Sequence, residues 1–388
     1  MIEKIINKLC QFPHRLTTTE NEKKASEILK AELEALGYKT TIEKFSSPRT
    51  FSWTYFVIYL GFFISFLSAI FFPAVGLVIF ILALVIFFGE QSSVFAPLTR
   101  GLFAQAQSQN IIAEPEDEAP SPIRIWLVAH YDTSKTSLAF APNTVRFLRP
   151  LFLVSLALLG LGLVMMVIEL IFSGRSWLFP KIILSICAVY FLYMAVMMLE
   201  RELRGVPVQG ACDNASGVAV VMELAKRLAQ SPLKNLNFRI LLTGAEEVGL
   251  VGMANFLKKH KKELDPKRDF FINFDSIGEG EVCYITKEGM LFPLSASSLL
   301  LELAQEVSRD EKFAKVKPSP YTALTLDTLV ARARGFPVIS IMALTKDKIP
   351  KPWHWFDDTK DKVDINKLFL ASDFVWEMLK RLAQKTRF

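Results

Sequence analysis

The chain has 388 residues, which is enough for one large α/β domain with membrane segments or for two domains. Apolar residues make up 51% of it, more than a soluble domain of this size usually contains, so the excess must be concentrated somewhere. The net charge of +6 comes without a basic stripe interleaved with aromatic residues, so we expect no nucleic-acid binding.

The four cysteines show no Cys-x-x-Cys spacing, which argues against a disulfide framework and against a cysteine-based zinc site; they are Cys10, Cys187, Cys212 and Cys283. We see no secretory signal, because the N-terminus is polar and amphipathic. Apolar and small residues at helical spacing predict a helix over 20–36 that stops at Gly37, and the alternation over 39–45 predicts a strand.

Two long apolar stretches predict two transmembrane hairpins. Residues 53–88 carry no charge, and Pro73 divides them into pieces of about 15–20 residues, close to the length that crosses a bilayer. Residues 148–200 break at 173–176 into two halves, each long enough to span. Buried core helices are the alternative, but two such pairs favour four transmembrane helices. We expect Glu169, near the end of the third, to reach the membrane interface.

Each hairpin returns the chain to its starting side, so residues 1–52, 89–147 and 201–388 are predicted to form one soluble domain. The basic residues of these parts that lie near the membrane outnumber those on the opposite side, where only Arg175 and Lys181 are found. An excess of Lys and Arg marks cytoplasmic segments, so we predict a multi-pass membrane protein with a cytoplasmic domain. The basic residues on that side are Lys39, Lys44, Arg49, Arg100, Lys135, Arg146, Arg149, Arg201 and Arg204.

The soluble parts read as an α/β fold. Short apolar runs predict buried strands, and helical patterns lie between them, which implies a mostly parallel central sheet covered by helices on both faces. The acidic stretch 114–122 contains prolines and predicts a surface turn. The expected strands are 123–128, 238–242, 270–274 and 337–343, and the expected helices are 216–228, 245–259, 294–308 and 364–383.

Polar side chains follow these strands where each one ends. His130 and Asp132 come after 123–128, the pair Glu246-Glu247 comes after 238–242, and Asp275 comes after 270–274. Asp213 precedes the helix 216–228. Ligands of open α/β sheets bind beyond the carboxyl ends of the strands, so we expect these residues to share one rim.

This set of residue types suits a hydrolytic two-metal site, which needs a bridging oxygen ligand and a general base. Zinc favours imidazole nitrogen and carboxylate oxygen, so His130 and His354 could each serve one ion, with Asp213 as the bridge. Glu247 and Asp275 would complete one ligand set each.

Asp132 and Glu246 have other expected roles. Asp132 can accept the second ring N–H of His130 and fix its tautomer. Adjacent side chains diverge, so Glu246 is better placed as the general base than as a second ligand beside Glu247. Taken singly, each residue has a structural alternative as an ion pair, a helix cap or a turn residue. The other histidines, His14 and His260, lie in a polar turn and in a charge run, and we expect neither to bind metal.

The motifs, in this order, resemble those of the co-catalytic zinc aminopeptidases of peptidase clan MH, of the aminopeptidase Y and bacterial leucyl aminopeptidase type. They are His130-Tyr131-Asp132, Gly210-Ala211-Cys212-Asp213-Asn214-Ala215-Ser216-Gly217, Glu246-Glu247, Asn273-Phe274-Asp275, and His354 with Asp357-Asp358-Thr359 and Asp361-Lys362-Val363-Asp364. The resemblance implies a phosphorylase/hydrolase-like fold, two zinc ions and hydrolysis of peptide bonds.

The resemblance also implies roles for single residues. His130, Asp213 and Asp275 would bind one zinc ion, and Asp213, Glu247 and His354 the other. Glu246 would be the base and Asp132 the partner that orients a ligand. Asp327 matches a further family aspartate before the turn 335–337, but Thr328 replaces the neighbouring histidine, which leaves its substrate-side role open.

The expected function is therefore that of a membrane-anchored zinc metallopeptidase, and among these we expect an aminopeptidase that acts through a zinc-bridging water. Alternatives are a glutaminyl cyclase using one zinc, a carboxypeptidase on the same scaffold, and a non-catalytic peptide-binding membrane protein. The second hairpin falls between Asp132 and Asp213. It is either a simple anchor or a sign that the substrates are hydrophobic or membrane-proximal peptides.

Overall fold

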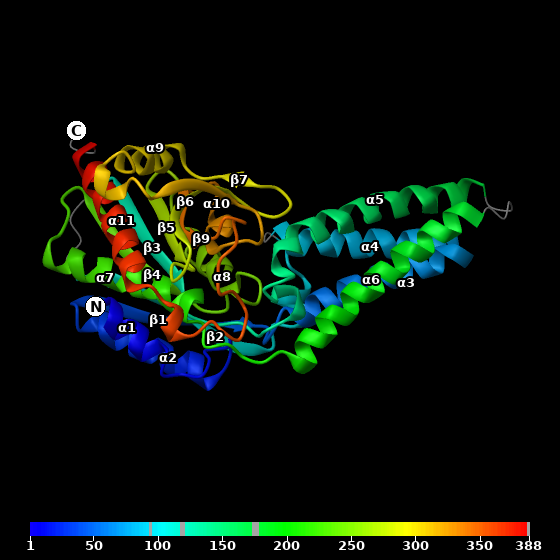
Figure 1. The fold of residues 1–388 in the computed structure, drawn as a ribbon, viewed down its shortest axis with the longest axis horizontal. Helices are drawn as coiled ribbons and strands as arrows, with labels where there is room; N and C mark the ends of the chain where they lie inside the picture. The colour runs from blue at the N-terminus through cyan, green and yellow to red at the C-terminus, as the bar shows by residue number, and fades with distance from the viewer. Residues whose placement is uncertain (93–94, 117–120, 173–177, 386–388) are drawn as a thin grey trace. The chain divides into compact units, whose positions relative to one another are not determined.

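A computed structural model describes residues 1–92, 95–116, 121–172 and 178–385 (Figure 1). The described chain divides into two compact units. The sheet unit comprises Met1–Arg49, Gln105–Thr136 and Val206–Phe388, and the helical unit comprises Thr50–Ala104 and Ser137–Gly205.

The sheet unit is built on one mixed sheet, with strands in the order β1-β2-β4-β3-β5-β9-β6-β7 and β8 beside β6. The neighbours β4, β3, β5 and β9 are parallel, but β1–β2, β2–β4, β9–β6 and β6–β7 are antiparallel. The prediction of a mostly parallel sheet is therefore wrong outside the centre. The strands are β1 (Tyr38–Ser47), β2 (Ala106–Pro115), β3 (Ile123–His130), β4 (Leu236–Thr243), β5 (Asp269–Asp275), β6 (Glu281–Glu288), β7 (Leu294–Ser295), β8 (Lys317–Tyr321) and β9 (Val338–Leu344).

The sequence pattern missed the strands β2, β6, β7 and β8. β2 carries Ser108, Gln109 and Asn110 in buried positions, so its composition resembles that of a loop. Glu114 and Pro115, predicted in a surface turn, are the last residues of β2 and pair with β1. Residues 117–120 of that predicted turn lie outside the described residues.

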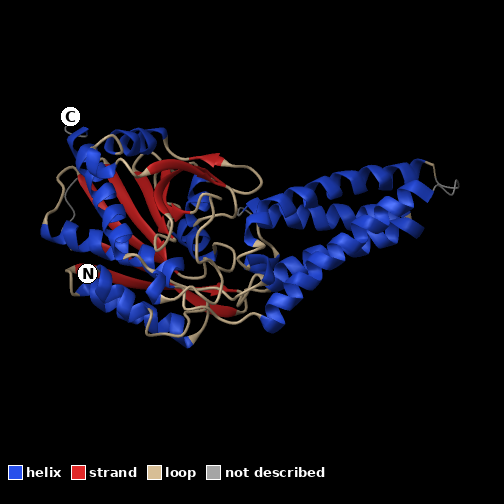
Figure 2. Cartoon of the chain, in the orientation of Figure 1, coloured by secondary structure: helices blue, strands red, loops and turns tan. Residues whose placement is uncertain are grey.

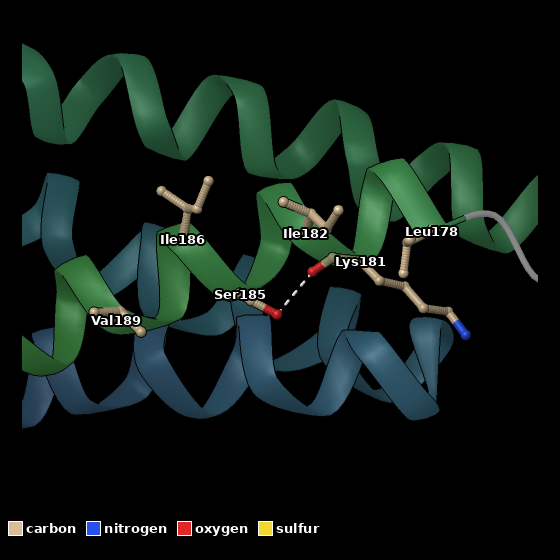
Figure 3. Close-up of a pocket in the computed structure, with 6 residues that line it drawn as sticks. All are labelled: Leu178, Lys181, Ile182, Ser185, Ile186 and Val189. Atoms are coloured by element: carbon tan, nitrogen blue, oxygen red, sulfur yellow. Dashed lines mark hydrogen bonds between the residues drawn. The ribbon is translucent and has the colours of Figure 1, made fainter.

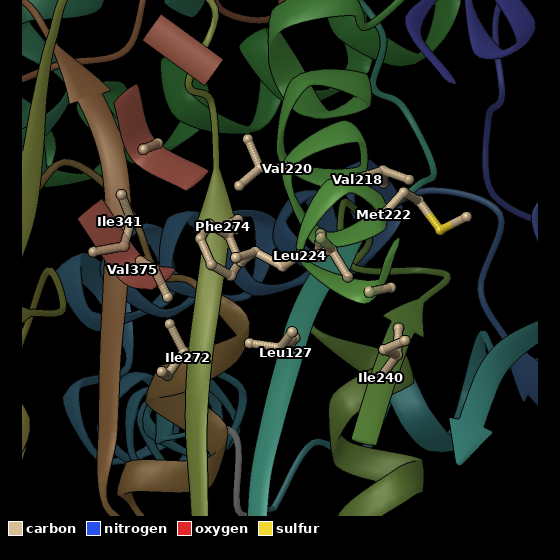
Figure 4. Packing of buried hydrophobic residues seen from close by; sticks show 14 of the residues in the cluster. Leu127, Val218, Val220, Met222, Leu224, Ile240, Ile272, Phe274, Ile341 and Val375 are labelled. Atoms are coloured by element: carbon tan, nitrogen blue, oxygen red, sulfur yellow. The ribbon is translucent and has the colours of Figure 1, made fainter. Parts of the chain in front are cut away.

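Helices pack on both faces of the sheet (Figure 2). Along β3, Leu127 contributes to one hydrophobic cluster, while Trp126 and Val128 contribute to the other, as side chains of a strand alternate between faces. Figure 4 shows Leu127 and Ile272 of the sheet beside Leu224 of α7 in the larger cluster. The helices are α1 (Ile2–Leu9), α2 (Glu20–Glu34), α7 (Ser216–Gln230), α8 (Val251–Lys259), α9 (Ser298–Val307), α10 (Asp327–Arg332) and α11 (Ile365–Lys385).

Two predicted helices begin later than the sequence pattern indicates. The helix expected over 245–259 is α8, which starts at Val251, because Ala245, Gly249 and Leu250 have positive φ angles and form a turn. The helix expected over 294–308 is α9, which follows the short strand β7.

The helical unit contains α3 (Ser52–Phe71), α4 (Pro73–Ser92), α5 (Leu148–Ile171) and α6 (Leu178–Arg204). All four are long and apolar enough to cross a membrane. Their contact surfaces are aromatic: the ring centroids of Phe62 and Phe191 are 5.1 Å apart, and those of Phe66 and Phe191 are 5.7 Å apart. Gly162 of α5 lies directly against the ring of Phe66, where a larger residue would not fit.

Outward-facing residues of the helical unit are apolar too. Figure 3 shows one face of α6 that lines a shallow cavity of about 440 Å³, in which the Ser185 hydroxyl donates a hydrogen bond of 2.8 Å to the carbonyl of Lys181. Val189, further along this face, is 67% exposed. Apolar side chains exposed over whole helices are what a lipid environment would accommodate.

Candidate metal centre

The predicted site residues lie together at one edge of the sheet. His130 and Asp275 are the last residues of β3 and β5, and Glu246 and Glu247 stand in the turn after β4. Asp213 lies in the short segment Ala211–Ala215 before α7, at a kink where its own backbone is not helical. His354 lies in the loop after β9. The parallel strands therefore deliver these side chains from their carboxyl ends.

Asp213 lies between the two imidazole rings. Its Oδ1 is 3.1 Å from Nε2 of His130, and its Oδ2 is 3.2 Å from Nε2 of His354. Each carboxylate oxygen thus faces a different histidine, which is the arrangement of a carboxylate that could bridge two ions.

The remaining acids flank the rings. Nε2 of His130 is 3.5 Å from Oδ2 of Asp275 and 3.9 Å from Oε2 of Glu246. Nε2 of His354 is 2.9 Å from Oε2 of Glu247. Donor atoms within 4.8 Å of one another form two groups, one of His130, Asp213 and Glu247 and the other of His130, Glu246 and Asp275. The second group brings Glu246 as near as a ligand would be.

The donor set fits divalent metal ions on electrostatic grounds. Burial of carboxylates without compensating charge is costly, and burial raises the pKa of Glu246 well above its ordinary value and also raises that of Glu247. Burial alone would lower the pKa of His354, but Glu247 and Asp213 raise it to about 9. Without metal the cluster would therefore hold protons. Cations bound between these oxygens and nitrogens would supply that charge instead, and imidazole and carboxylate are zinc ligands.

Asp132 holds the turn that carries the acidic pair. It is fully buried, and its carboxylate accepts hydrogen bonds from the backbone N–H of Glu246 (3.1 Å) and of Glu247 (3.2 Å). Its Oδ1 lies 3.5 Å from Nδ1 of His130, the ring nitrogen that it was predicted to engage. The Thr17 hydroxyl donates a further bond of 2.8 Å to Oδ2.

Asp358 fixes the loop of Asp213, a role that the sequence did not indicate. Its carboxylate accepts hydrogen bonds from the backbone N–H of Cys212 (2.7 Å) and of Asp213 (3.2 Å). Burial raises the pKa of Asp358 to about 8. Only its place in the motif after His354 could have drawn attention to it.

Asn214 connects the start of α7 to the end of β5. Its side-chain oxygen accepts from the backbone N–H of Gly217 (2.9 Å) and of Ser276 (3.2 Å), and its amide donates to the carbonyl of Phe274 (2.9 Å). The loop of Asp213 is thereby fixed against the strand that ends in Asp275.

Asp327 is buried at the start of α10 and accepts a hydrogen bond from the hydroxyl of Thr243, the last residue of β4. Burial raises its pKa to about 7. Thr328, which stands where a family histidine was expected, donates to Glu288 (2.8 Å). Glu288 is a buried acid that the sequence did not single out, and burial raises its pKa to about 8.

The two other histidines lie elsewhere. Nδ1 of His14 accepts from the backbone N–H of Leu16, and His260 lies 3.1 Å from Glu43 and 3.0 Å from Glu263.

Parts of the chain are similar in sequence to known peptidases. Residues 195–379 match the sequence model of peptidase family M28. The alkaline phosphatase isozyme conversion protein of Escherichia coli is 30% identical over 115 residues, which are 30% of this chain and 33% of that protein. The probable lipoprotein aminopeptidase LpqL of Mycobacterium tuberculosis is 35% identical over 103 residues, which are 26% of this chain and 21% of that protein. These alignments thus span a third or less of the relatives' own length.

Solved structures share the fold. A zinc aminopeptidase of Bacillus subtilis superimposes with a TM-score of 0.57 at 13% identity, covering 98% of this chain and 94% of that one. A glutaminyl cyclase of Bacteroides thetaiotaomicron gives a TM-score of 0.58 at 16% identity, covering 98% and 96%. At such identities the likeness concerns the fold alone. Residues 195–379 thus resemble peptidase family M28 in sequence, and this match together with the shared fold supports a zinc-dependent metallopeptidase.

Proposed function

We propose that this chain is a zinc-dependent exopeptidase that removes residues from the free amino end of peptides. The observation that carries the proposal is Asp213, whose two carboxylate oxygens each face one buried imidazole within 3.2 Å. The relative LpqL is named a probable lipoprotein aminopeptidase, which supports an aminopeptidase rather than another kind of peptidase.

We assign His130, Asp213 and Asp275 to one zinc ion and Asp213, Glu247 and His354 to the other. The distances from the two rings to these carboxylates, 2.9–3.5 Å, support the division. Glu246 stands further from His130, at 3.9 Å, and its side chain is 11% exposed, the most accessible of the three acids that flank the rings. We therefore keep Glu246 as the base, with Asp132 as the residue that orients His130.

When bound, the zinc ions would supply Lewis-acid activation of the attacking water and of the scissile carbonyl. Glu246 accepts a proton from this water while the water oxygen forms a bond to the carbonyl carbon. The same carboxyl then delivers the proton to the amine nitrogen as the carbon–nitrogen bond breaks. Asp132 keeps the Glu246 backbone in place throughout.

Three substrates test this proposal on the zinc-loaded protein: leucine p-nitroanilide, its N-acetylated form, and a peptide with N-terminal glutamine. We expect release of nitroaniline from the first and at least about a hundredfold less from the second, because an aminopeptidase requires a free amine. Cyclisation of the glutaminyl peptide without hydrolysis of the anilide would instead support the glutaminyl cyclase alternative. Hydrolysis from the carboxyl end would support a carboxypeptidase.

We also propose that residues 53–88 and 148–200 anchor the peptidase in a membrane as two hairpins, and that its substrates are hydrophobic peptides. The four apolar helices support the anchor. The path of the chain supports the substrate class. The sheet unit ends at Thr136, four residues after Asp132, and resumes at Val206, seven residues before Asp213, so the helical insertion is close in sequence to both site residues. Hydrolysis of a membrane-partitioning and a soluble peptide by the enzyme in nanodiscs would be compared. Equal rates would exclude this preference.

A further inference from the structure

The second inserted segment separates the two parts of the chain that carry His130 and Asp213. The chain leaves the sheet unit after Thr136 and returns at Val206. There the backbone N–H of Thr136 donates to the carbonyl of Val206 (2.8 Å), and the N–H of Val208 donates to the carbonyl of Ser134 (3.1 Å). These two bonds join the two ends of the insertion. They lie after Asp132 and before Gly210 in the chain, so they do not involve the residues next to His130 or Asp213. A further contact joins the two segments that bear these ligands directly.

Arg15 makes that contact. Its side chain is completely buried, and within the described part of the chain its guanidinium donates four hydrogen bonds, all to backbone carbonyls. Nε donates to Tyr131 (2.7 Å), the residue between His130 and Asp132. Nη1 and Nη2 donate to Gln209 and Gly210, at 2.8 Å each, shortly before Asp213. One planar group thus joins both ligand-bearing segments.

The segment around Arg15 is itself fixed to the same place. The Arg15 backbone N–H donates to Oγ1 of Thr133 (3.0 Å), and the N–H of Thr133 donates to the carbonyl of Arg15 (3.2 Å). A fourth bond of the guanidinium, from Nη1 to the carbonyl of Leu9 (3.2 Å), ties it to the end of α1. The guanidinium therefore enters the site from a rigidly held backbone.

The chemistry of the side chain matters here. A guanidinium presents its donors in a flat, fixed fork, so it can reach carbonyls in different directions at once, whereas the ammonium of lysine is a compact point charge. Burial of a cation is costly, and the carboxylates of Asp132, Asp213 and Asp358 offset part of that cost without accepting a hydrogen bond from the guanidinium. The hydrogen bonds themselves all go to backbone carbonyls, so they depend on the geometry of the fork.

We infer that Arg15 is a positioning residue of the proposed zinc centre, which sets the separation between His130 and Asp213 by joining their backbones across the second insertion. This inference rests on the proposed function. Loss of the fork should loosen the spacing of two ligands, so the affinity for zinc and the rate of the chemical step should fall while substrate binding changes little.

The test compares Arg15→Lys with Arg124→Lys in the full-length protein. Arg124 lies at the other end of β3, is also buried, and donates to Asp269 (2.9 Å) and to the carbonyl of Glu263 (2.9 Å), so it controls for the loss of a buried guanidinium. Zinc affinity is measured by competition with a chromogenic chelator, and kcat and KM are measured on leucine p-nitroanilide at saturating zinc.

We expect Arg15→Lys to bind zinc about 10–100-fold more weakly and to lose kcat by a similar factor, with KM within about threefold of the wild type. Arg124→Lys should match the wild type in zinc affinity and kcat. Wild-type zinc affinity and kcat in folded Arg15→Lys would overturn the inference. If Arg15→Lys does not fold, Thr133→Val, which removes only the acceptor of the Arg15 N–H, should weaken zinc binding in the same direction, and unchanged affinity there would overturn it equally.

The two proposals fail in different ways. If the wild-type protein neither binds zinc nor cleaves any of the three test substrates, the proposed function is wrong. If the wild type does both and Arg15→Lys behaves like Arg124→Lys, only the role of Arg15 is wrong.

Discussion

Buried carboxylates hold the loops of this centre by accepting hydrogen bonds from its backbone. Asp132 fixes the turn of Glu246 and Glu247, and Asp358 fixes the loop of Asp213. Replacing either acid would leave buried N–H groups unsatisfied at about 1–3 kcal/mol each. The side chains that would meet metal and substrate are therefore held by residues that do not need to touch either.

Glu246 provides the sharpest single substitution. Glu246→Gln keeps the size of the side chain and removes its ability to accept a proton, so we expect kcat to fall by about 10²–10⁴-fold. Zinc content, measured by atomic emission on the same preparation, should remain that of the wild type, because Glu246 is assigned as base and not as ligand. Loss of one zinc per chain would instead make Glu246 a ligand, and kcat within tenfold of wild type would remove it from the mechanism.

The sequence indicated the proposed ligands more clearly than the residues that support them. Strand ends are visible as apolar runs, so His130, Glu246, Glu247 and Asp275 could be placed at one rim from pattern alone. The support is non-local: Arg15 lies 116 positions from Tyr131, and Asp358 lies 146 positions from Cys212. No local pattern reports such pairs.

The strands and turns show the same limit. The apolar runs predicted β3, β5 and β9, whereas β2 has polar residues in buried positions and is recognised as a strand only by its pairing with β4 and β1. The turn before α8 was mistaken for helix because its apolar spacing continues through Ala245 and Leu250, whose positive φ angles appear only in the structure.

Glu22 makes the packing of α2 sensitive to pH. Its carboxylate accepts from the hydroxyl of Ser108 on β2 (2.6 Å) and from the backbone N–H of Thr18 (2.6 Å), and burial raises its pKa from 4.5 to about 8. The folded state holds this proton more tightly than the unfolded state, so the free energy of unfolding should fall as pH rises from about 4.5 to about 8.

Glu22→Gln should remove this contribution. We expect the variant to gain stability relative to the wild type as pH rises from 5 to 9. The free energy of unfolding would be measured by denaturant titration monitored by tryptophan fluorescence. Glu34→Gln, at an exposed position of the same helix, serves as the control. The same pH profile in Glu22→Gln and the wild type would contradict the raised pKa of Glu22.

The contact between α8 and the turn after β4 depends on a glycine. A Cβ added at Gly252 would lie 2.1 Å from the carbonyl oxygen of Gly244 and 2.6 Å from Oδ1 of Asn110. We expect Gly252→Ala to cost about 1–3 kcal/mol of stability and to lower kcat, because Gly244 leads into the turn of Glu246.

Thermal unfolding and steady-state kinetics would measure both effects. Gly160→Ala is the matched control, because a Cβ added there meets nothing within 4 Å. An unchanged melting temperature in Gly252→Ala would show that the backbone relaxes at no cost.

The two units of the chain have different surfaces, one with its apolar residues gathered in a core and the other with apolar residues exposed along four helices. Their sequence boundaries make each pair of helices an insertion into the chain of the sheet unit. The basic residues flanking the insertions predict that the sheet unit is cytoplasmic.

Cysteine labelling on intact cells tests this orientation. The native cysteines are all buried, so labelling reports on a single cysteine introduced at the exposed Lys262 or, in the sequence between the two halves of 148–200, at Arg175. We expect a membrane-impermeant maleimide to label Arg175→Cys on intact cells and Lys262→Cys only after permeabilisation. The reverse pattern would place the sheet unit outside.

A zinc titration of the chelator-stripped protein tests most directly the proposal that the chain is a two-zinc peptidase. Hydrolysis of leucine p-nitroanilide would be followed as zinc is added in steps at a protein concentration well above the dissociation constant. The arrangement of Asp213 between His130 and His354 predicts no activity without metal and full activity at two zinc ions per chain. Activity that survives removal of the metal, or that reaches its maximum at one zinc ion, would contradict it.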